Sequence, residues 1–123
     1  MRRQNNRQIG DKKEKFVCDW LEKHGYHVIE RNFWCRSGEI DIVAREGAYL
    51  VFIEVKYRRG AVCGDPSEAV DRRKQQTISR VALFYLLWHG YAENTPVRFD
   101  VVAVSGGSDM EVHLFRNAFE YCG

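Results

Sequence analysis

Residues 38–58 read GEIDIVAREGAYLVFIEVKYR, and this stretch decides the fold. Two runs rich in β-branched and aromatic residues, 39–45 and 49–57, lie on either side of a glycine, which predicts two antiparallel strands in a hairpin. Because side chains alternate along a strand, Glu39 and Asp41 should share one face of the first strand. Glu54 and Lys56 should likewise share one face of the second, while the apolar residues between these positions face a core.

The length of the turn decides how these polar side chains meet. A two-residue turn at Glu46-Gly47 would pair Glu39 with Glu54, whereas a four-residue loop would pair Asp41 with Glu54. In either case the acids and the lysine lie on one face, within about 8 Å of one another. A three-residue loop would break this arrangement.

Acids this close together repel one another, and a cation would relieve the repulsion. Mg²⁺ or Mn²⁺ suits such a group because it prefers oxygen ligands, and it could polarise a phosphodiester and activate a bound water. Lys56 could orient that water or stabilise charge on the phosphate. Glu14, at the border of an apolar helix face, either joins this site or is an ordinary surface glutamate. A solvent-facing hairpin with alternating polar residues is the alternative interpretation of the whole set.

The rest of the chain predicts an α/β fold in a single domain. Apolar spacing over Gly10–His24 and again from about Glu68 to Trp88 predicts two amphipathic helices. With the hairpin and three further strands, the order is α-β-β-β-α-β plus one strand, a mixed sheet flanked by helices. Residues 1–8 are a basic segment expected to be flexible, and residues 9–123 form the domain. The further strands are expected at His27–Phe33, Pro96–Val104 and Met110–Phe115.

Composition narrows the functional classes. The longest uncharged stretch, Val81–Ala92, is shorter than the roughly 20 apolar residues that span a bilayer. The basic N-terminus is not followed by an apolar run, so no secretory signal is predicted and the expected location is the cytoplasm, without a membrane partner. The four cysteines show no metal-binding spacing and are expected to be free thiols with packing roles.

Basic clusters follow the hairpin and open the second helix. The net charge is only +2, but such clusters suit a polyanion, so nucleic acid is the expected partner. Taken singly, each cluster could equally be a set of solvated surface charges. The residues concerned are Arg58, Arg59, Arg72, Arg73 and Lys74.

An Asp followed by Glu-x-Lys, here Asp41 and then Glu54 and Lys56, resembles the motif of the restriction-endonuclease-like superfamily. Over most of its length the chain is similar to the YraN-type family of uncharacterised bacterial proteins, related to archaeal Holliday-junction resolvases. The matching segments include Gly10 and Glu14, Arg31–Trp34, Gly64–Val70, Lys74 and Arg98–Val102.

The resemblance implies a restriction-endonuclease-like core and a role for each motif residue. It assigns metal binding to Asp41 and Glu54, with Glu39 and Glu14 as supporting acids, and the position of catalytic lysine to Lys56. In related nucleases a glutamine on the following helix can assist, which makes Gln75 a candidate, although a surface glutamine is the alternative.

The leading hypothesis is therefore a Mg²⁺-dependent endodeoxyribonuclease, a hydrolase acting on branched or otherwise structured DNA. The main alternative is a non-catalytic nucleic-acid-binding module that keeps this fold. An interaction or scaffold protein would leave the acids and the lysine without a role. The sequence does not fix the oligomeric state, and a homo-oligomer stays open.

Overall fold

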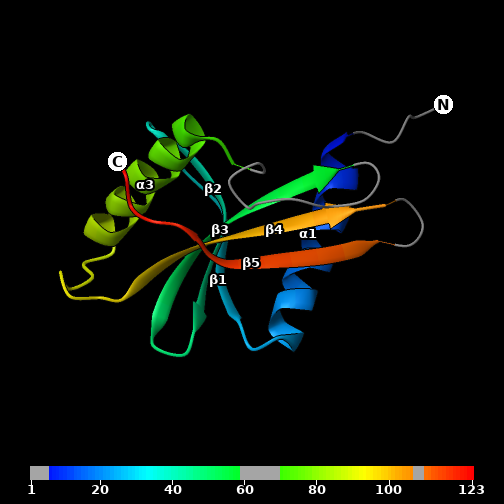
Figure 1. Cartoon of the computed structure of the whole chain (residues 1–123), viewed down its shortest axis with the longest axis horizontal. Coiled ribbons are helices and arrows are strands. Elements are labelled where there is room, and N and C mark those ends of the chain that lie inside the picture. Colours follow the sequence, from blue (N-terminus) through cyan, green and yellow to red (C-terminus); the bar gives the residue numbers. More distant parts are fainter. Residues whose placement is uncertain (1–5, 59–69, 107–109) are drawn as a thin grey trace.

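The structure, a computed structural model, describes residues 6–58, 70–106 and 110–123, with side chains described from residue 12. One mixed sheet with strand order β1-β2-β3-β4-β5 runs through it, in which β3 and β4 are parallel and the other neighbours antiparallel (Figure 1). The elements are α1 (Asn6–Lys23), β1 (His27–Cys35), β2 (Gly38–Glu46), β3 (Tyr49–Arg58), α3 (Arg72–Trp88), β4 (Val97–Ser105) and β5 (Glu111–Phe119).

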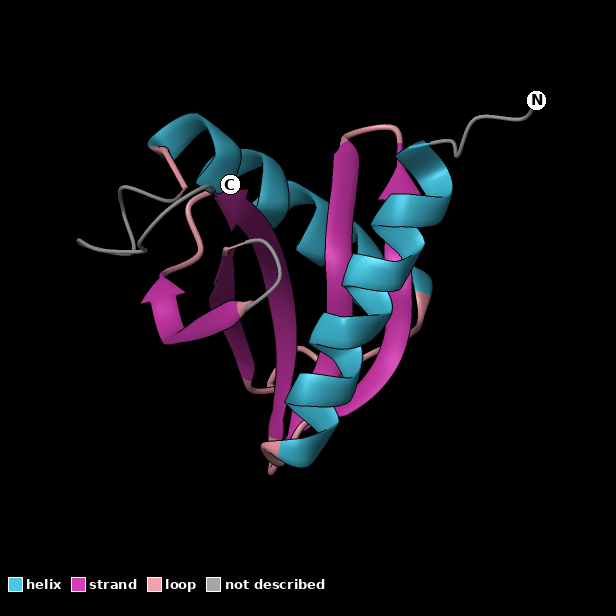
Figure 2. Cartoon of the chain, turned by 90° about the vertical axis from the view of Figure 1, so that its right-hand side faces the viewer, coloured by secondary structure: helices cyan, strands magenta, loops and turns pink. Residues whose placement is uncertain are grey.

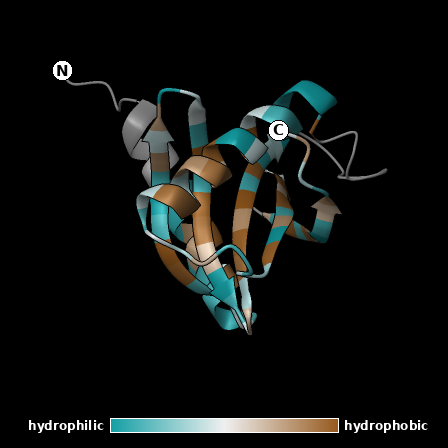
Figure 3. Ribbon diagram, turned by 90° about the vertical axis from the view of Figure 1, so that its left-hand side faces the viewer, coloured by the Kyte–Doolittle hydropathy of each residue, from teal (hydrophilic) through white to brown (hydrophobic). Residues whose placement is uncertain are grey.

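The sheet has a core on each face. On one face of the sheet, Val17 and Leu21 of α1 pack over strand residues such as Ile53. On the other face, Ile78 and Val81 of α3 pack over a second set of strand residues. Figure 2 shows α1 in front of the strands and α3 behind them, and Figure 3, seen from the α3 side, shows apolar positions along the strands that this helix covers. The predicted α-β-β-β-α-β core with a mixed sheet flanked by helices is confirmed, and β5 is the additional strand.

The largest boundary differences from the sequence-based prediction, four residues each, fall on three elements. Helix α1 begins at Asn6, inside the segment 1–8, of which residues 1–5 lie outside the described part. Helix α3 begins at Arg72 rather than near residue 68, because the Asp71 carboxylate accepts a hydrogen bond from the Lys74 N–H at 2.8 Å and so caps the helix there. Strand β5 continues to Phe119 because its partner β4 supplies a ladder to Phe99.

The hairpin has a two-residue turn at residues 47–48, one residue later than a turn at Glu46-Gly47, and its register is the one that the four-residue alternative gives. Glu46 pairs with Tyr49. When this register is continued along the two strands, Asp41 and not Glu39 comes opposite Glu54. The printed sequence allowed both registers, and the close turn at residues 47–48 decides between them.

Strand β2 changes the face it presents at Asp41. Ile42 lies in the α1-side core and Ile40 in the α3-side core, so the prediction that the apolar residues beside the acids share one face of β2 is wrong. The β2–β3 ladder runs only from Ile42 to Glu46, and across from Asp41 in β1, Asn32 adopts the left-handed conformation with φ 55°. The regular alternation therefore stops where the proposed acids lie.

In the described ranges, no helix is both long enough and apolar enough to cross a membrane. The cysteines described, Cys18, Cys35 and Cys122, are free, as expected, whereas Cys63 lies outside the described residues.

Candidate active site

Asp41 lies at the point where β2 leaves the ladder with β3. Its Oδ2 accepts a hydrogen bond from the backbone N–H of Val55 at 2.8 Å, so a side chain takes the place that the next rung of the ladder would occupy. This bond fixes the Asp41 carboxylate beside β3 at Val55, the residue that directly follows Glu54 in the chain. A charge-assisted bond of this kind is stronger than a neutral one and orients the acid.

Glu54 is a buried acid, and its neighbour of like charge, Asp41, is partly buried. Its residue is only 6% exposed, in the strand that is covered on both faces. The pKa of Glu54 is raised to about 7, first by burial and then by the charge of the Asp41 carboxylate and a hydrogen bond between the two carboxyl groups. Lys74 and Lys56 act in the opposite direction. Such an acid pair is costly to hold in a fold, which marks it as a candidate site.

Two lysines approach the same oxygen of Glu54. The distance from Nζ to Oε2 is 3.7 Å for Lys56 and 3.8 Å for Lys74, and both side chains are partly exposed. Lys56 follows Glu54 by two residues on β3, as predicted, whereas Lys74 comes from the first turn of α3. Sequence reasoning had placed Lys74 in a basic cluster and among the residues that match the family, but had not placed it beside the acids.

The close packing of α3 against β2 explains how Lys74 reaches the acids. Gly38, at the start of β2, has φ +147°, and a Cβ built on it would lie 2.7 Å from Cγ2 of Thr77. Only a residue without a side chain lets this strand approach α3 so closely, which brings the first turn of the helix over the acid pair.

Glu39 lies at the margin of the site rather than within the pair. The residue as a whole is exposed, but partial burial of its carboxyl group raises its pKa, and Asp41 and Glu14 raise it further while Lys74 opposes them. The three acids and Lys74 therefore influence one another electrostatically.

Glu14 is held by β1. Its Oε1 accepts a hydrogen bond from the side-chain amide of Asn32 at 2.7 Å and lies 3.5 Å from Nε of Arg31. Its charge contributes to raising the pKa of Tyr57 to about 12, after burial, which is the largest cause. Glu14 thus lies close to the site but is already paired, and Asn32 is a positioning residue that sequence reasoning missed. The backbone of Asn32 is in the left-handed conformation, which asparagine tolerates better than most residues and which marks this position as unusual.

The predicted nucleic-acid-binding residues are distributed unevenly around the acids. Arg58, Arg72 and Arg73 are exposed, and Arg73 and Lys74 line a shallow hollow of about 300 Å³ with Asp71 and Thr77. The side chain of Gln75 donates to the backbone carbonyl of Val70 at 3.0 Å, which gives it a structural contact near the start of α3. Arg59 lies outside the described residues.

The donor set fits a small divalent cation that keeps most of its own water. In the described part of the chain, no group of three or more His, Cys, Asp or Glu side chains is spaced to hold a metal ion. Asp41 and Glu54 remain as an oxygen pair, and Mg²⁺ is commonly bound by one or two carboxylates together with water and substrate phosphate. The acid pair therefore fits Mg²⁺ or Mn²⁺ better than an ion that needs a complete protein cage.

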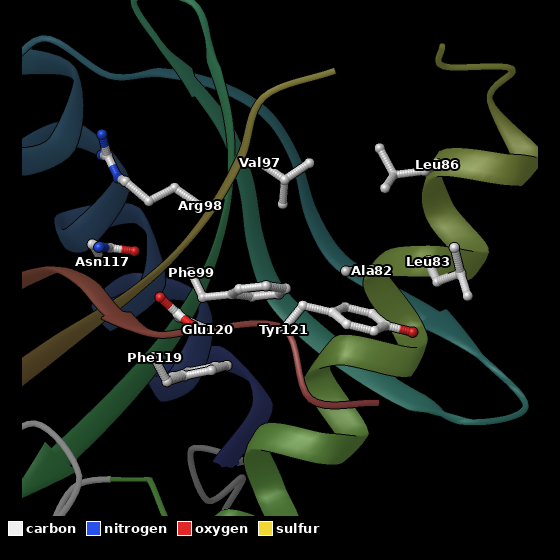
Figure 4. A pocket seen from close by; sticks show the side chains of 10 residues that line it. All are labelled: Ala82, Leu83, Leu86, Val97, Arg98, Phe99, Asn117, Phe119, Glu120 and Tyr121. Atoms are coloured by element: carbon white, nitrogen blue, oxygen red, sulfur yellow. The ribbon is translucent and has the colours of Figure 1, made fainter. Parts of the chain in front are cut away.

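A larger cavity of about 400 Å³ lies elsewhere, between α3, the end of β5 and the start of β4 (Figure 4). Its lining is mainly apolar and includes Leu83, Leu86, Phe99, Phe119 and Tyr121. None of the predicted site residues takes part in it. The titratable groups, rather than the size of a cavity, therefore mark the candidate site.

Fold and site together define a small α/β protein in which an acid pair and two lysines meet where two strands part. The chain belongs to the family described as "Uncharacterised protein family UPF0102", whose profile matches residues 13–104. The resemblance inferred from the motifs is thereby confirmed.

Relatives match along almost the whole chain. A UPF0102 protein of Lachnoclostridium phytofermentans is 45% identical over 119 residues, covering 97% of this chain and 98% of the relative. Another from Symbiobacterium thermophilum is 45% identical over 116 residues, with 93% and 98% covered. Among solved structures, Pyrococcus furiosus SfsA in complex with Ca²⁺ aligns with 94% of this chain and 65% of its own, at 14% identity. Its TM-score is 0.37, too low to support an argument.

Proposed function

We propose that this protein is a divalent-metal-dependent endonuclease that hydrolyses phosphodiester bonds in branched or otherwise structured DNA. The observation that carries the proposal is the pairing of the buried Glu54 with the partly buried Asp41, with Lys56 beside them, at the point where β2 leaves β3. A plain surface hairpin would leave its acids exposed to water, whereas here Glu54 is buried next to a second acid.

Each side chain has a separate task in this proposal. Asp41, held by the Val55 N–H, and Glu54 supply the oxygen ligands for Mg²⁺ or Mn²⁺. The bound cation would polarise the phosphodiester and lower the pKa of a coordinated water. Lys56 would orient that water and stabilise the negative charge that develops on the phosphate oxygens. Glu39 and Glu14 strengthen the negative potential at the edge of the site.

Binding of the substrate is assigned to the exposed arginines around the acids. Arg58 at the end of β3, and Arg72 and Arg73 at the start of α3, would contact backbone phosphates and so position the DNA without reading its sequence. Affinity should therefore depend strongly on salt concentration.

A cleavage screen tests the proposal. End-labelled hairpins, flaps, four-way junctions and linear duplexes, in DNA and RNA forms, are incubated with the protein in Mg²⁺, in Mn²⁺ and in EDTA. We expect cleavage of branched DNA that requires the metal ion and is lost in Asp41→Asn. Salt-dependent binding without cleavage of any substrate would instead favour the non-catalytic nucleic-acid-binding module.

A further inference from the structure

Lys74 makes a contact that its place in a basic cluster does not explain. Its Nζ lies 3.8 Å from Oε2 of Glu54, the same atom that Lys56 approaches at 3.7 Å, and it also acts on Glu39. Glu54 is buried, whereas the side chain of Lys74 is 40% exposed. Lys74 therefore joins the acid pair from the solvent side.

The distance from Nζ of Lys74 to Oε2 of Glu54 is short enough for electrostatic attraction. It is too long for a direct hydrogen bond, for which about 2.7–3.2 Å is typical. Lys74 also lies in the first turn of α3, where a cation meets the positive end of the helix dipole and where the neighbouring acid, the N-cap Asp71, is already bound to the backbone N–H of Lys74. Helix stability thus gives no reason for a lysine here, and the charge that attracts it is that of the acids.

The backbone of Lys74 is held in place by its surroundings. Its backbone N–H is bound by the Asp71 cap, and the contact between Gly38 and Thr77 holds this turn of α3 against β2. The ammonium group can therefore swing over a short range, between Glu54 and the shallow hollow that Lys74 lines with Arg73.

We propose that Lys74 is a resident counter-cation of Glu54, which a divalent ion displaces and which then binds the phosphate of the substrate. This inference rests on the proposed nuclease function and deepens it. Two consequences follow: Lys74 competes with the metal ion for Glu54, and it contributes to DNA binding only when the metal is bound.

Calorimetric titration with Mn²⁺ alone tests the first consequence. Lys74→Met should bind Mn²⁺ roughly fivefold more tightly than the wild type, the factor for two unit charges about 4 Å apart in a largely aqueous dielectric. Lys74→Arg keeps the charge and should stay near the wild type. Arg73→Met, in the same helical turn but without a recorded contact to the acid pair in the described structure, is the matched control and should leave Mn²⁺ affinity unchanged.

Fluorescence anisotropy with a labelled DNA hairpin tests the second consequence, measured in the cold before cleavage sets in. Lys74→Met should weaken DNA binding in Mn²⁺ but not in EDTA, whereas Arg73→Met should weaken it in both buffers. Circular dichroism of each variant verifies that the fold is intact.

The outcomes separate this inference from the proposed function. If the wild type binds Mn²⁺ and cleaves DNA but Lys74→Met behaves like Arg73→Met in both assays, the displaced-cation role is refuted and the nuclease proposal stands. If the wild type binds no Mn²⁺, both fall together.

Discussion

Replacing Glu54 by glutamine should stabilise the metal-free protein, although it removes a charged partner of two lysines. The pKa of Glu54 is raised from 4.5 to about 7, so the protonated form is favoured in the fold. Stability linked to this proton is fully present below pH 4.5 and is lost as pH rises through about 7. Glutamine resembles the protonated acid and cannot lose it.

The size of the effect follows from the same shift. A change in pKa from 4.5 to about 7 corresponds to about 3 kcal/mol, because a tenfold change in acid dissociation is worth about 1.4 kcal/mol. For a domain of 123 residues this raises Tm by roughly 10 °C. The full gain is expected at about pH 8, and most of it should vanish at about pH 5.

Thermal melts in EDTA at both pH values measure this. Glu93→Gln, on an exposed turn between α3 and β4, removes the same charge far from the acids and should shift Tm little at either pH. A Glu54→Gln protein that is no more stable than the wild type at the higher pH would show that Glu54 is not strained by its neighbours, and the electrostatic basis of the site would be lost.

Three further predictions concern the surroundings of the site. Gly38→Ala should destabilise the protein by about 2 kcal/mol through the clash with Thr77 and the unfavourable φ, and an added Thr77→Ser should restore part of it in thermal melts. Asn32→Gly and Asn32→Ala both lose the hydrogen bond to Glu14, but only alanine is also strained by the left-handed backbone conformation. Chemical denaturation should therefore find the alanine variant less stable than the glycine variant by about 1 kcal/mol. Equal stability of the two variants would contradict the role of φ. Arg73→Ala should reduce the slope of log K against log salt for duplex DNA by about 0.9, and an unchanged slope would exclude it from phosphate contact.

Strand patterning was enough to predict that Glu54 and Lys56 lie together on β3. Ile53 and Val55 alternate with Glu54 and Lys56 and lie in the core on the α1 side, as the period of two requires. The central strand could also be recognised by its nearly continuous apolar run, because β3 is buried on both faces. These features depend on local sequence alone.

The change of face at Asp41 could not be predicted in the same way. A period-two pattern assumes an uninterrupted ladder, whereas β2 leaves β3 at this residue and the Asp41 side chain takes over a backbone hydrogen bond. Asn32, which lies across from Asp41 in β1, has a left-handed backbone that marks the irregularity once the structure is known. The sequence alone does not reveal it, because its hydrogen-bond partner Glu14 lies 18 residues away in the chain.

The contact between Lys74 and Glu54 depends on how α3 crosses the sheet. That crossing is set by the approach of Gly38 to Thr77, a long-range contact that no helical or strand periodicity encodes. The same limit applies to Gln75, whose side chain bonds to Val70 instead of reaching the acids.

The central claim is tested most directly by the initial rate of cleavage of an end-labelled DNA four-way junction in Mg²⁺, compared between the wild type and Lys56→Met. The account predicts metal-dependent cleavage by the wild type and a loss of about a hundredfold or more in the variant, as found when one preorganised group that stabilises developing charge is removed. The variant should still bind Mn²⁺, because the lysine is not a ligand. Cleavage that continues at the same rate in Lys56→Met, or that is absent from the wild type at saturating Mg²⁺, would contradict the account.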